Sequence, residues 1–326
     1  MFQYDDPTVA ATLPTPAAAG TAGYFTNGSA GSGTPATILT ADFMNAVMLE
    51  LLNVVTASGA TPSKTSQSQI LTAMKSMFSP AVGTVRNLVM SITAASATAT
   101  LTADEITVET ALGGTPFKLA SFNKTINLAT TGAGGMDTGT APTSGFVALY
   151  AIYNPTTQTS ALLATNAATL QPNVYGGANL PAGYTASALV SVWPTNASKQ
   201  FIVGYQNDRS IKMLAVTMLG TSTAAGSLTS LSIAGAVPLN AKTVSGTVGI
   251  TFTTTAGTQL SCAIASSSSA LGQQVVGVGG AASTVNTING VFADLNLVTA
   301  QTVFYIFSFG GGTGQSLVVQ ANGYTF

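Results

Sequence analysis

Carboxylates are the side chains of this sequence that could carry out catalysis, because none of its 326 residues is histidine. Without histidine the chain lacks the general base of Ser-His-Asp and Cys-His hydrolases and the commonest protein ligand of zinc. A glycosidase needs only two carboxyl groups, about 5 Å apart in retaining enzymes and about 6.5–9.5 Å apart in inverting ones. Glycan hydrolysis is therefore the enzymatic alternative that stays open, and metal-dependent hydrolysis is disfavoured.

The carboxylates in question form one cluster and three isolated positions. Asp104, Glu105 and Glu109 make up the cluster. Asp104 and Glu105 point to opposite faces if this segment is a strand, which favours a role in capping or solvating a turn. The isolated carboxylates, in turn-like surroundings, are Asp137, Asp208 and Asp294. Because isolated carboxylates of this kind usually stabilise turns or ion pairs, we expect no catalytic site.

Two glycine-rich segments, Gly132–Gly135 and Gly310–Gly314, have the composition of a phosphate-binding loop. A phosphate loop carries a lysine and opens a helix, whereas neither segment is followed by lysine and strands are expected around both. We interpret both as turns and expect neither a cofactor nor a bound metal. The single cysteine, Cys262, lies in an alternating apolar stretch and is expected to be a core residue.

Charged residues are unusually scarce. They make up 6% of the chain, against about 25% in an ordinary soluble domain. Nine basic and ten acidic side chains leave a net charge of −1, which gives no field to attract nucleic acid or an anionic membrane. A lone subunit with so few charges would be prone to self-association. We therefore expect an obligate oligomer in which identical copies bury one another's apolar surface.

The chain is expected neither to enter a membrane nor to be secreted. No segment reaches the roughly 18 uninterrupted apolar residues that a membrane span requires. The opening MFQYDDP has acidic residues where a secretory signal would carry positive charge. These features predict synthesis in a cytoplasm.

Residues 1–39 are expected to be an extended arm. Prolines and glycines recur along this segment and prevent a regular element from propagating. The arm carries separated aromatic residues that could dock on a partner while the chain between them follows its surface, namely Phe2, Tyr4, Tyr24 and Phe25. A disordered leader is the alternative interpretation.

Two amphipathic helices are predicted after the arm. Thr40 is a suitable N-cap for a helix over Ala41–Val55, with Asp42 in its first turn. A second helix is predicted from about Ser66 to Phe78, where Ser79-Pro80 ends it. Two short helices cannot bury both apolar stripes against each other, so packing around a three-fold axis or into a host assembly is expected.

From Val82 onward apolar residues tend to recur at every second position, which predicts a mainly β chain. Phe146–Thr165 contains two apolar runs separated by Asn154-Pro155 and predicts a β-hairpin. A segment rich in small residues, Met213–Ser230, is interpreted as a seam between two strand series. We therefore predict an attachment region with an arm and two helices at 1–80, a middle β-sandwich domain at 81–213 and a C-terminal β-sandwich domain at 214–326.

Several motifs are shared with one family. They include Asp5-Asp6-Pro7-Thr8, Ala19–Phe25 (AGTAGYF), VALYAIYNP at 147–155 and Leu180–Tyr184 (LPAGY). On these residues the sequence resembles tail fibre proteins of tailed bacteriophages and related prophages. The last hundred residues, ending in Gly323-Tyr324-Thr325-Phe326, are similar in character to the C-terminal β-sandwich tips of such fibres. One departure is the absence of a clear internal repeat, which implies a short fibre.

The resemblance implies a homotrimer found in the virion as a tail fibre and made in the cytoplasm of the host bacterium. Its N-terminal region would attach to tail baseplate proteins, through Phe2, Tyr4, Asp5, Asp6, Tyr24 and Phe25. Its distal end would bind a glycan or lipopolysaccharide on the host surface. The same chain could serve a tail-only bacteriocin particle.

The distal segment Val285–Leu295 is our hypothesis for the receptor surface. Shallow sugar sites combine an aromatic face with amide or carboxylate acceptors on a rigid β scaffold. The candidate residues in this expected loop-to-strand passage are Asn286, Asn289, Phe292 and Asp294. The alternative is that Phe292 belongs to the core and the asparagines form turns. Two other functions stay open, a tail spike with glycan depolymerase activity and a purely structural tail or capsid component.

Overall fold

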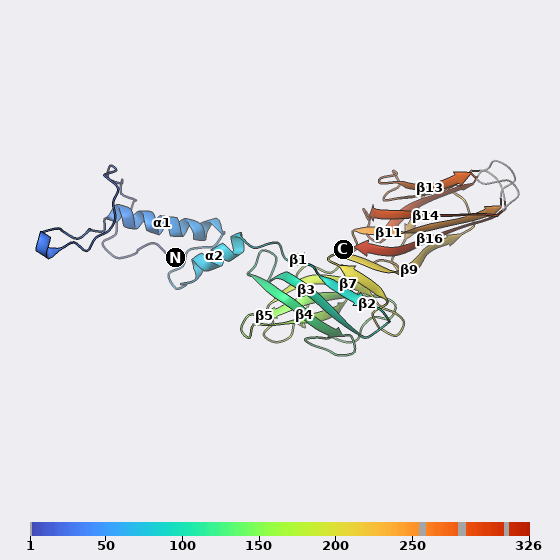
Figure 1. Cartoon of the computed structure of the whole chain (residues 1–326), viewed down its shortest axis with the longest axis horizontal. Coiled ribbons are helices and arrows are strands. Elements are labelled where there is room, and N and C mark those ends of the chain that lie inside the picture. Colours follow the sequence, from blue (N-terminus) through green and yellow to red (C-terminus); the bar gives the residue numbers. More distant parts are fainter. Residues whose placement is uncertain (1, 254–258, 280–284, 310–312) are drawn as a thin grey trace. The chain divides into compact units, whose positions relative to one another are not determined.

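The computed structural model describes residues 2–253, 259–279, 285–309 and 313–326 (Figure 1). It divides into two compact units, Met1–Ser79 and Pro80–Phe326. The division falls next to the boundary expected at residue 80. Part of the glycine turn expected at Gly310–Gly314, residues 310–312, lies outside the described residues. No helix of the described residues is long and apolar enough to cross a membrane.

The N-terminal unit contains the arm and two helices, α1 (Ala41–Ala57) and α2 (Gln69–Met77), with a short 3-10 turn, η1 (Ala30–Ser32), in the arm. Both predicted helices are therefore present. The hydroxyl of Thr40 accepts a hydrogen bond from the backbone N–H of Phe43 at 3.4 Å, which caps α1 as its sequence indicates. Ser58 is the C-cap of the helix, and Gly59 after it takes a left-handed conformation with φ of 80°.

The second unit is mainly β, and all its described strand pairs are antiparallel. Its strands are β1 (Val85–Arg86), β2 (Val89–Ile92), β3 (Thr98–Glu109), β4 (Pro116–Asn127), β5 (Phe146–Asn154), β6 (Thr159–Asn166), β7 (Ala186–Pro194), β8 (Gly204–Asn207), β9 (Ser210–Thr221), β10 (Ala225–Ser232), β11 (Thr243–Thr253), β12 (Gln259–Ala265), β13 (Gln274–Gly279), β14 (Val285–Asn296), β15 (Thr302–Phe309) and β16 (Thr313–Thr325).

These strands form two sheets. The larger runs β14-β11-β16-β9-β8-β2-β3-β7-β5-β6, with β1 and β4 also paired to β3, and the smaller runs β10-β15-β12-β13. The segment expected as a seam between domains, Met213–Ser230, forms most of β9 and much of β10 instead. β9 pairs with β8 on one side and β16 on the other, so the larger sheet continues across the boundary expected at 213–214.

The predicted hairpin is present in the middle of this unit. β5 and β6 pair in antiparallel register, with Tyr150 opposite Leu163. The side-chain oxygen of Asn154 accepts hydrogen bonds from the backbone N–H groups of Thr156 and Thr157, which forms the turn. Most of β5 is buried on both faces, as its unbroken apolar sequence indicates.

One hydrophobic core contains residues from both sheets. Its largest fully buried side chains include Trp193, Tyr150, Tyr324, Phe252 and Phe307. The hydroxyl of Tyr324 donates to the backbone oxygen of Val192, so β16, near the end of the chain, is bonded to β7. Cys262 is buried, as expected, and burial raises the pKa of its thiol to about 12.

A tyrosine pair fixes the long connection between β6 and β7. The hydroxyl of Tyr175 donates to Asp137 Oδ2 at 2.8 Å, and its ring packs edge-on against Tyr150 at 5.4 Å. The hydroxyl of Tyr150 donates to the backbone oxygen of Pro172 at 2.8 Å. Burial, and then the bond to Asp137, raise the pKa of Tyr175 to about 12.

This arrangement predicts a pH dependence of stability above neutrality. An unfolded tyrosine has a pKa of about 10, so between that pH and about 12 the folded chain binds the Tyr175 proton that the unfolded chain releases. The stabilisation is present below pH 10 or so and is lost as the pH rises through this window. We expect Tyr175→Phe to reduce the slope of unfolding free energy against pH there, measured by chemical denaturation. Asp137→Asn should lower the pKa of Tyr175, measured by tyrosinate absorbance; an unchanged pKa would contradict the assignment.

A second prediction concerns Gly246 in β11. A Cβ at this position would collide with the backbone oxygen of Gln320 and come within 2.6 Å of the Phe292 ring. We expect Gly246→Ala to lower the free energy of unfolding by about 1–3 kcal/mol, the usual cost of overpacking a core. Gly220→Ala in β9 is the matched control, since its Cβ would meet nothing within 4 Å. Thermal unfolding of both variants checks this, and equal stability would show that the strands can separate to admit the methyl group.

Candidate functional site

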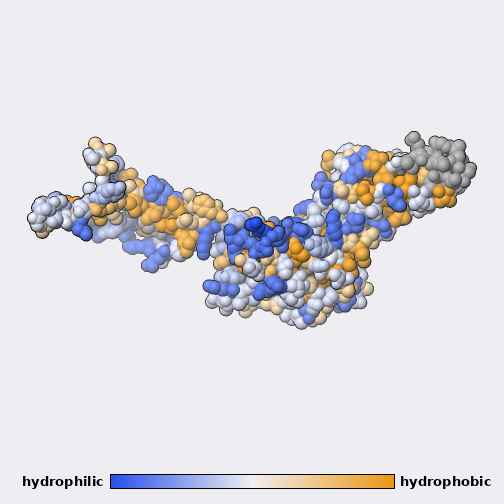
Figure 2. Space-filling view, in the orientation of Figure 1, coloured by the Kyte–Doolittle hydropathy of each residue, from blue (hydrophilic) through white to orange (hydrophobic). Residues whose placement is uncertain are grey.

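The N-terminal unit buries little apolar surface of its own. Among its described residues the buried hydrophobic side chains are Leu52, Val55 and Ala73. Large apolar side chains remain exposed on both helices, and hydrophobic residues colour much of the surface over α1 and α2 (Figure 2). They are Phe43, Met44 and Val47 on α1, and Leu71, Met74, Met77 and Phe78 on and after α2. Exposed apolar surface of this kind is typical of interaction sites.

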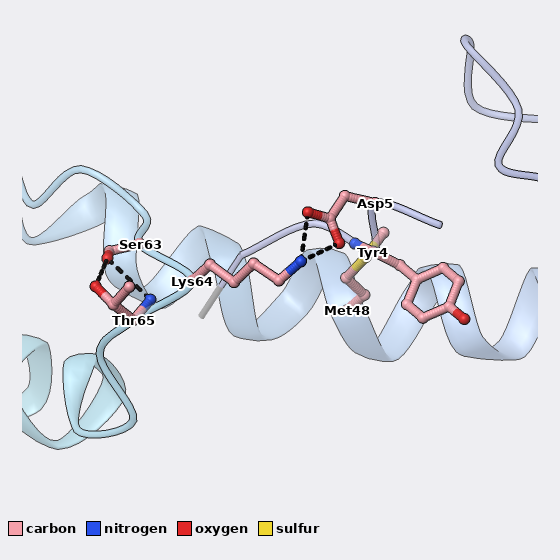
Figure 3. Close-up of polar contacts among 6 residues, drawn as sticks. All are labelled: Tyr4, Asp5, Met48, Ser63, Lys64 and Thr65. Atoms are coloured by element: carbon pink, nitrogen blue, oxygen red, sulfur yellow. Dashed lines mark hydrogen bonds and ion pairs between the residues drawn. The ribbon is translucent and has the colours of Figure 1, made fainter. Parts of the chain in front are cut away.

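The start of the chain lies along α1. The backbone N–H of Tyr4 contacts Met48 Sδ at 3.4 Å, and Lys64 Nζ lies 2.7 Å from both carboxylate oxygens of Asp5 (Figure 3). The side chains of Lys64 and Asp5 are 68% and 47% exposed. An ion pair this exposed contributes little stability, about 0–1 kcal/mol, but fixes the register of the two segments.

The loop before α2 holds Lys64 in place. Gln69, the first residue of α2, accepts a hydrogen bond from the backbone N–H of Ser63 at 3.0 Å and donates to the backbone oxygen of Thr61 at 2.9 Å. The hydroxyls of Ser63 and Thr65 lie 3.0 Å apart (Figure 3). These contacts close the loop on both sides of Lys64 and present its ammonium group to Asp5.

A cavity of about 910 Å³ lies between the start of the chain, α1 and this loop. Its volume is at the upper end of the range for ligand sites. Its lining includes Phe2, Tyr4, Met44, Met48, Lys64 and Ile70. Methionine fills irregular space and tolerates different partners, and this wall is mainly apolar. The cavity is therefore suited to receive apolar side chains beside one ion pair.

The rest of the arm touches α1 at two points. The backbone N–H of Ala17 donates to Asp42 Oδ2 at 2.9 Å. The rings of Phe25 and Phe43 pack edge to face, 5.2 Å between centroids. Tyr24, beside this contact, is fully exposed. Phe2 and Tyr4 line the cavity, whereas Tyr24 and Phe25 are not among its lining residues.

Asp6 has a local role. Its Oδ1 accepts hydrogen bonds from the backbone N–H and the hydroxyl of Thr8, at 3.0 and 2.7 Å. These bonds lower the pKa of Asp6 below its ordinary value. Of the six residues expected to contact a baseplate, Asp6 thus forms a turn and Asp5 forms the ion pair, while the four aromatic side chains are exposed.

The distal candidates lie in a strand, β14, rather than in a loop-to-strand passage. Phe292 is 3% exposed, and its ring packs against Gly246, so its assignment to a receptor surface is corrected: it is a core residue. Asp294 exchanges hydrogen bonds with Ser245, through its backbone N–H at 3.0 Å and its Oδ1 at 3.4 Å. Asn289 is exposed, and the backbone of Asn286 pairs with Phe252, while the Asn286 side chain lies outside what the structure describes.

The carboxylates considered for glycan hydrolysis have structural partners. Asp104 accepts from Asn87 Nδ2 at 2.6 Å, and Asp208 accepts from the backbone N–H of Leu88 at 3.0 Å. Glu109 accepts from the backbone N–H of Gly113 at 3.1 Å, in the turn after β3. Glu105 faces Lys118 at 3.9 Å. The described residues contain no group of three or more His, Cys, Asp or Glu side chains that could hold a metal ion.

The sequence did not predict that Lys64, Met44 and Met48 line the cavity between the start of the chain and α1. Thr61-Pro62-Ser63 indicated only a turn, and the methionines indicated only a helix stripe. One signal was available: Lys64 is the first basic residue of the chain and follows three acidic residues, Asp5, Asp6 and Asp42, together with Glu50. In so uncharged a sequence, that pattern favours a contact between the two segments.

Comparison with protein-family models gives no match to this chain, and comparison with curated protein sequences gives none either.

Proposed function

We propose that this chain is a homotrimeric tail fibre protein of a tailed bacteriophage or a related prophage particle. Its N-terminal unit joins the copies and attaches them to the tail baseplate. Its β-rich remainder binds a glycan or lipopolysaccharide on the surface of the host bacterium. The observation that carries this proposal is the exposed apolar surface of the two helices in a chain with 6% charged residues.

Identical copies are the partner best suited to the helix surface. Each face carries one charged residue at helical spacing, Glu50 beside Phe43 and Val47 on α1 and Lys75 beside Leu71 and Met74 on α2, and the two charges are of opposite sign. Covering a large apolar side chain is worth about 1.5–3 kcal/mol. A closed symmetric assembly gives every copy the same interface and so buries the apolar helix face of each copy equally. Three copies around one axis agree with the tail fibre resemblance of the arm and helix motifs.

The second unit supplies the receptor-binding part of the proposal. We propose that its two sheets form β-sandwich architecture, since residues of both sheets share one core. The receptor surface is proposed on the exposed face of β14, where Asn289 and Val291 are exposed while Phe292 is buried beneath them. An amide on a rigid strand beside an apolar side chain is suited to the polar and apolar faces of a sugar.

The trimer is tested by sedimentation. We expect the unaltered chain to sediment as a trimer and the double variant Leu71→Lys/Met74→Lys to dissociate, because burying unpaired charges costs several kcal/mol. The matched control is Thr72→Lys/Ser76→Lys, which adds the same charge to exposed polar positions of α2. A stable single subunit of the unaltered chain, or equal dissociation of both variants, would reject the proposed assembly.

Receptor binding is tested with point variants, because deleting residues 214–326 would cut through β9 and remove its partner β16. We expect Asn289→Ala to weaken binding of the labelled protein to susceptible cells by about fivefold, the loss that one hydrogen bond of roughly 1 kcal/mol predicts. The measurement is flow cytometry over a panel of bacterial strains.

The matched control for this variant is Asn123→Ala, an exposed asparagine in β4. If Asn123→Ala weakens binding and Asn289→Ala does not, the receptor surface lies elsewhere in the unit. If no strain binds the trimeric protein, the adhesive function is rejected. Oligosaccharides released from purified lipopolysaccharide or capsule would assign the glycan depolymerase function in its place.

A further inference from the structure

We propose that the start of the chain is exchanged between copies, so that residues 2–6 of one copy dock in the cavity formed by α1 and the 61–70 loop of a neighbouring copy. The inference rests on the proposed homotrimer and names the partner of the N-terminal cavity. The structure contains this contact within one chain, between Asp5 and Lys64 and between Tyr4 and Met48. Exchange preserves both contacts and changes only which copy supplies each side.

The connection between the docked residues and α1 is long enough to reach another copy, and its contacts with α1 at Ala17 and Phe25 would then also form between copies or be given up. From Pro7 to Thr40 every residue is exposed, apart from the half-buried Gly28. A connection of this length can reach on the order of 100 Å when extended. The entropic cost of closing a loop rises only slowly with its length. Docking on a neighbouring copy in the assembly therefore costs little more conformational entropy than docking within the same chain. Exchange of an identical segment is accordingly a low-cost route to an oligomer.

Charge complementarity selects the occupant of the cavity. Lys64 is the basic group of its wall, and Asp5 places both carboxylate oxygens 2.7 Å from its ammonium group. The other basic residue of the N-terminal unit is Lys75, on α2. A second copy necessarily carries both halves of the pair, in the same sequence context of Phe2 and Tyr4. No other partner is specified so completely by the residues present.

Residues 2–6 of one chain also fill the cavity incompletely. Phe2 and Tyr4 remain 45% and 71% exposed, and the cavity of about 910 Å³ stays open beside them. Exchange by itself leaves this space unchanged, but it brings the neighbouring copies close to the cavity, where further contacts between them can cover these side chains. Tyr24 and Phe25, which lie apart from the cavity, are then left for the tail baseplate.

Carbodiimide coupling tests the exchange directly. This reagent joins a lysine amine to a carboxylate in contact with it, forming an amide bond while the reagent takes up the water that is lost. We expect treatment of the assembled protein to give covalent dimers and trimers on a denaturing gel, with Lys64 joined to Asp5 in peptide maps. Lys64→Arg keeps the charge but removes the amine, so the covalent oligomers should be lost. Lys75→Arg, in the same unit, is the matched control and should retain them.

Two results would overturn the exchange. A Lys64–Asp5 linkage found only within single chains of a protein that sediments as a trimer would place the contact inside each copy, leaving the proposed function intact. Absence of any Lys64–Asp5 linkage from the trimer would show that residues 2–6 do not dock in this cavity. A protein that sediments as a single subunit would instead reject the homotrimer and the exchange together, so the two failures are distinguished by sedimentation.

Discussion

This structure depends on one constraint: a chain with so few charged residues must bury its apolar surface, because little charge is available to keep copies apart. In the second unit much of this surface is buried within the unit, because strands buried on both faces, such as β5 and β7, join a core shared by two sheets, while side chains such as Leu112, Leu214 and Val291 stay exposed. In the first unit little of it is buried, since among its described residues the buried apolar side chains are Leu52, Val55 and Ala73. One chain therefore combines a part with a large core of its own and a part whose helices bury little apolar surface. This contrast, more than any single motif, is why we assign assembly to the first unit and recognition to the second.

Much of the fold could be predicted from local chemistry. Thr40 caps α1, and Asn154 forms the turn of the β5–β6 hairpin, because both use side-chain oxygens to satisfy nearby backbone N–H groups. Such signals are contained within a few residues. The seam expected at Met213–Ser230 was wrong for the opposite reason: small residues are compatible with either a linker or a strand, and pairing of β9 with β16, a hundred residues away, decides the outcome.

The candidate sites show the same limit. Alternation in β14 indicates which residues share a face, but only the pairing with β11 determines that Phe292 faces the core and packs on Gly246. The aromatic residues of the arm could be singled out from the sequence, and all four are exposed. Their seat could not, because it depends on a contact between residues 59 positions apart in the sequence, Asp5 and Lys64. Side-chain chemistry could be read from the sequence, whereas the distant backbone that receives each side chain could not.

The continuity of the larger sheet through β9 also has a mechanical meaning. β9 is hydrogen-bonded to β8 along one edge and to β16 along the other, and Tyr324 bonds β16 back to β7. Tension applied to the end of the second unit would load the ladder between β9 and β16, which runs from Ser210 to Thr221, together with the shorter ladder between β9 and β8. Under the proposed function, a particle bound to a cell by this protein would transmit pulling forces through these hydrogen-bonded strands.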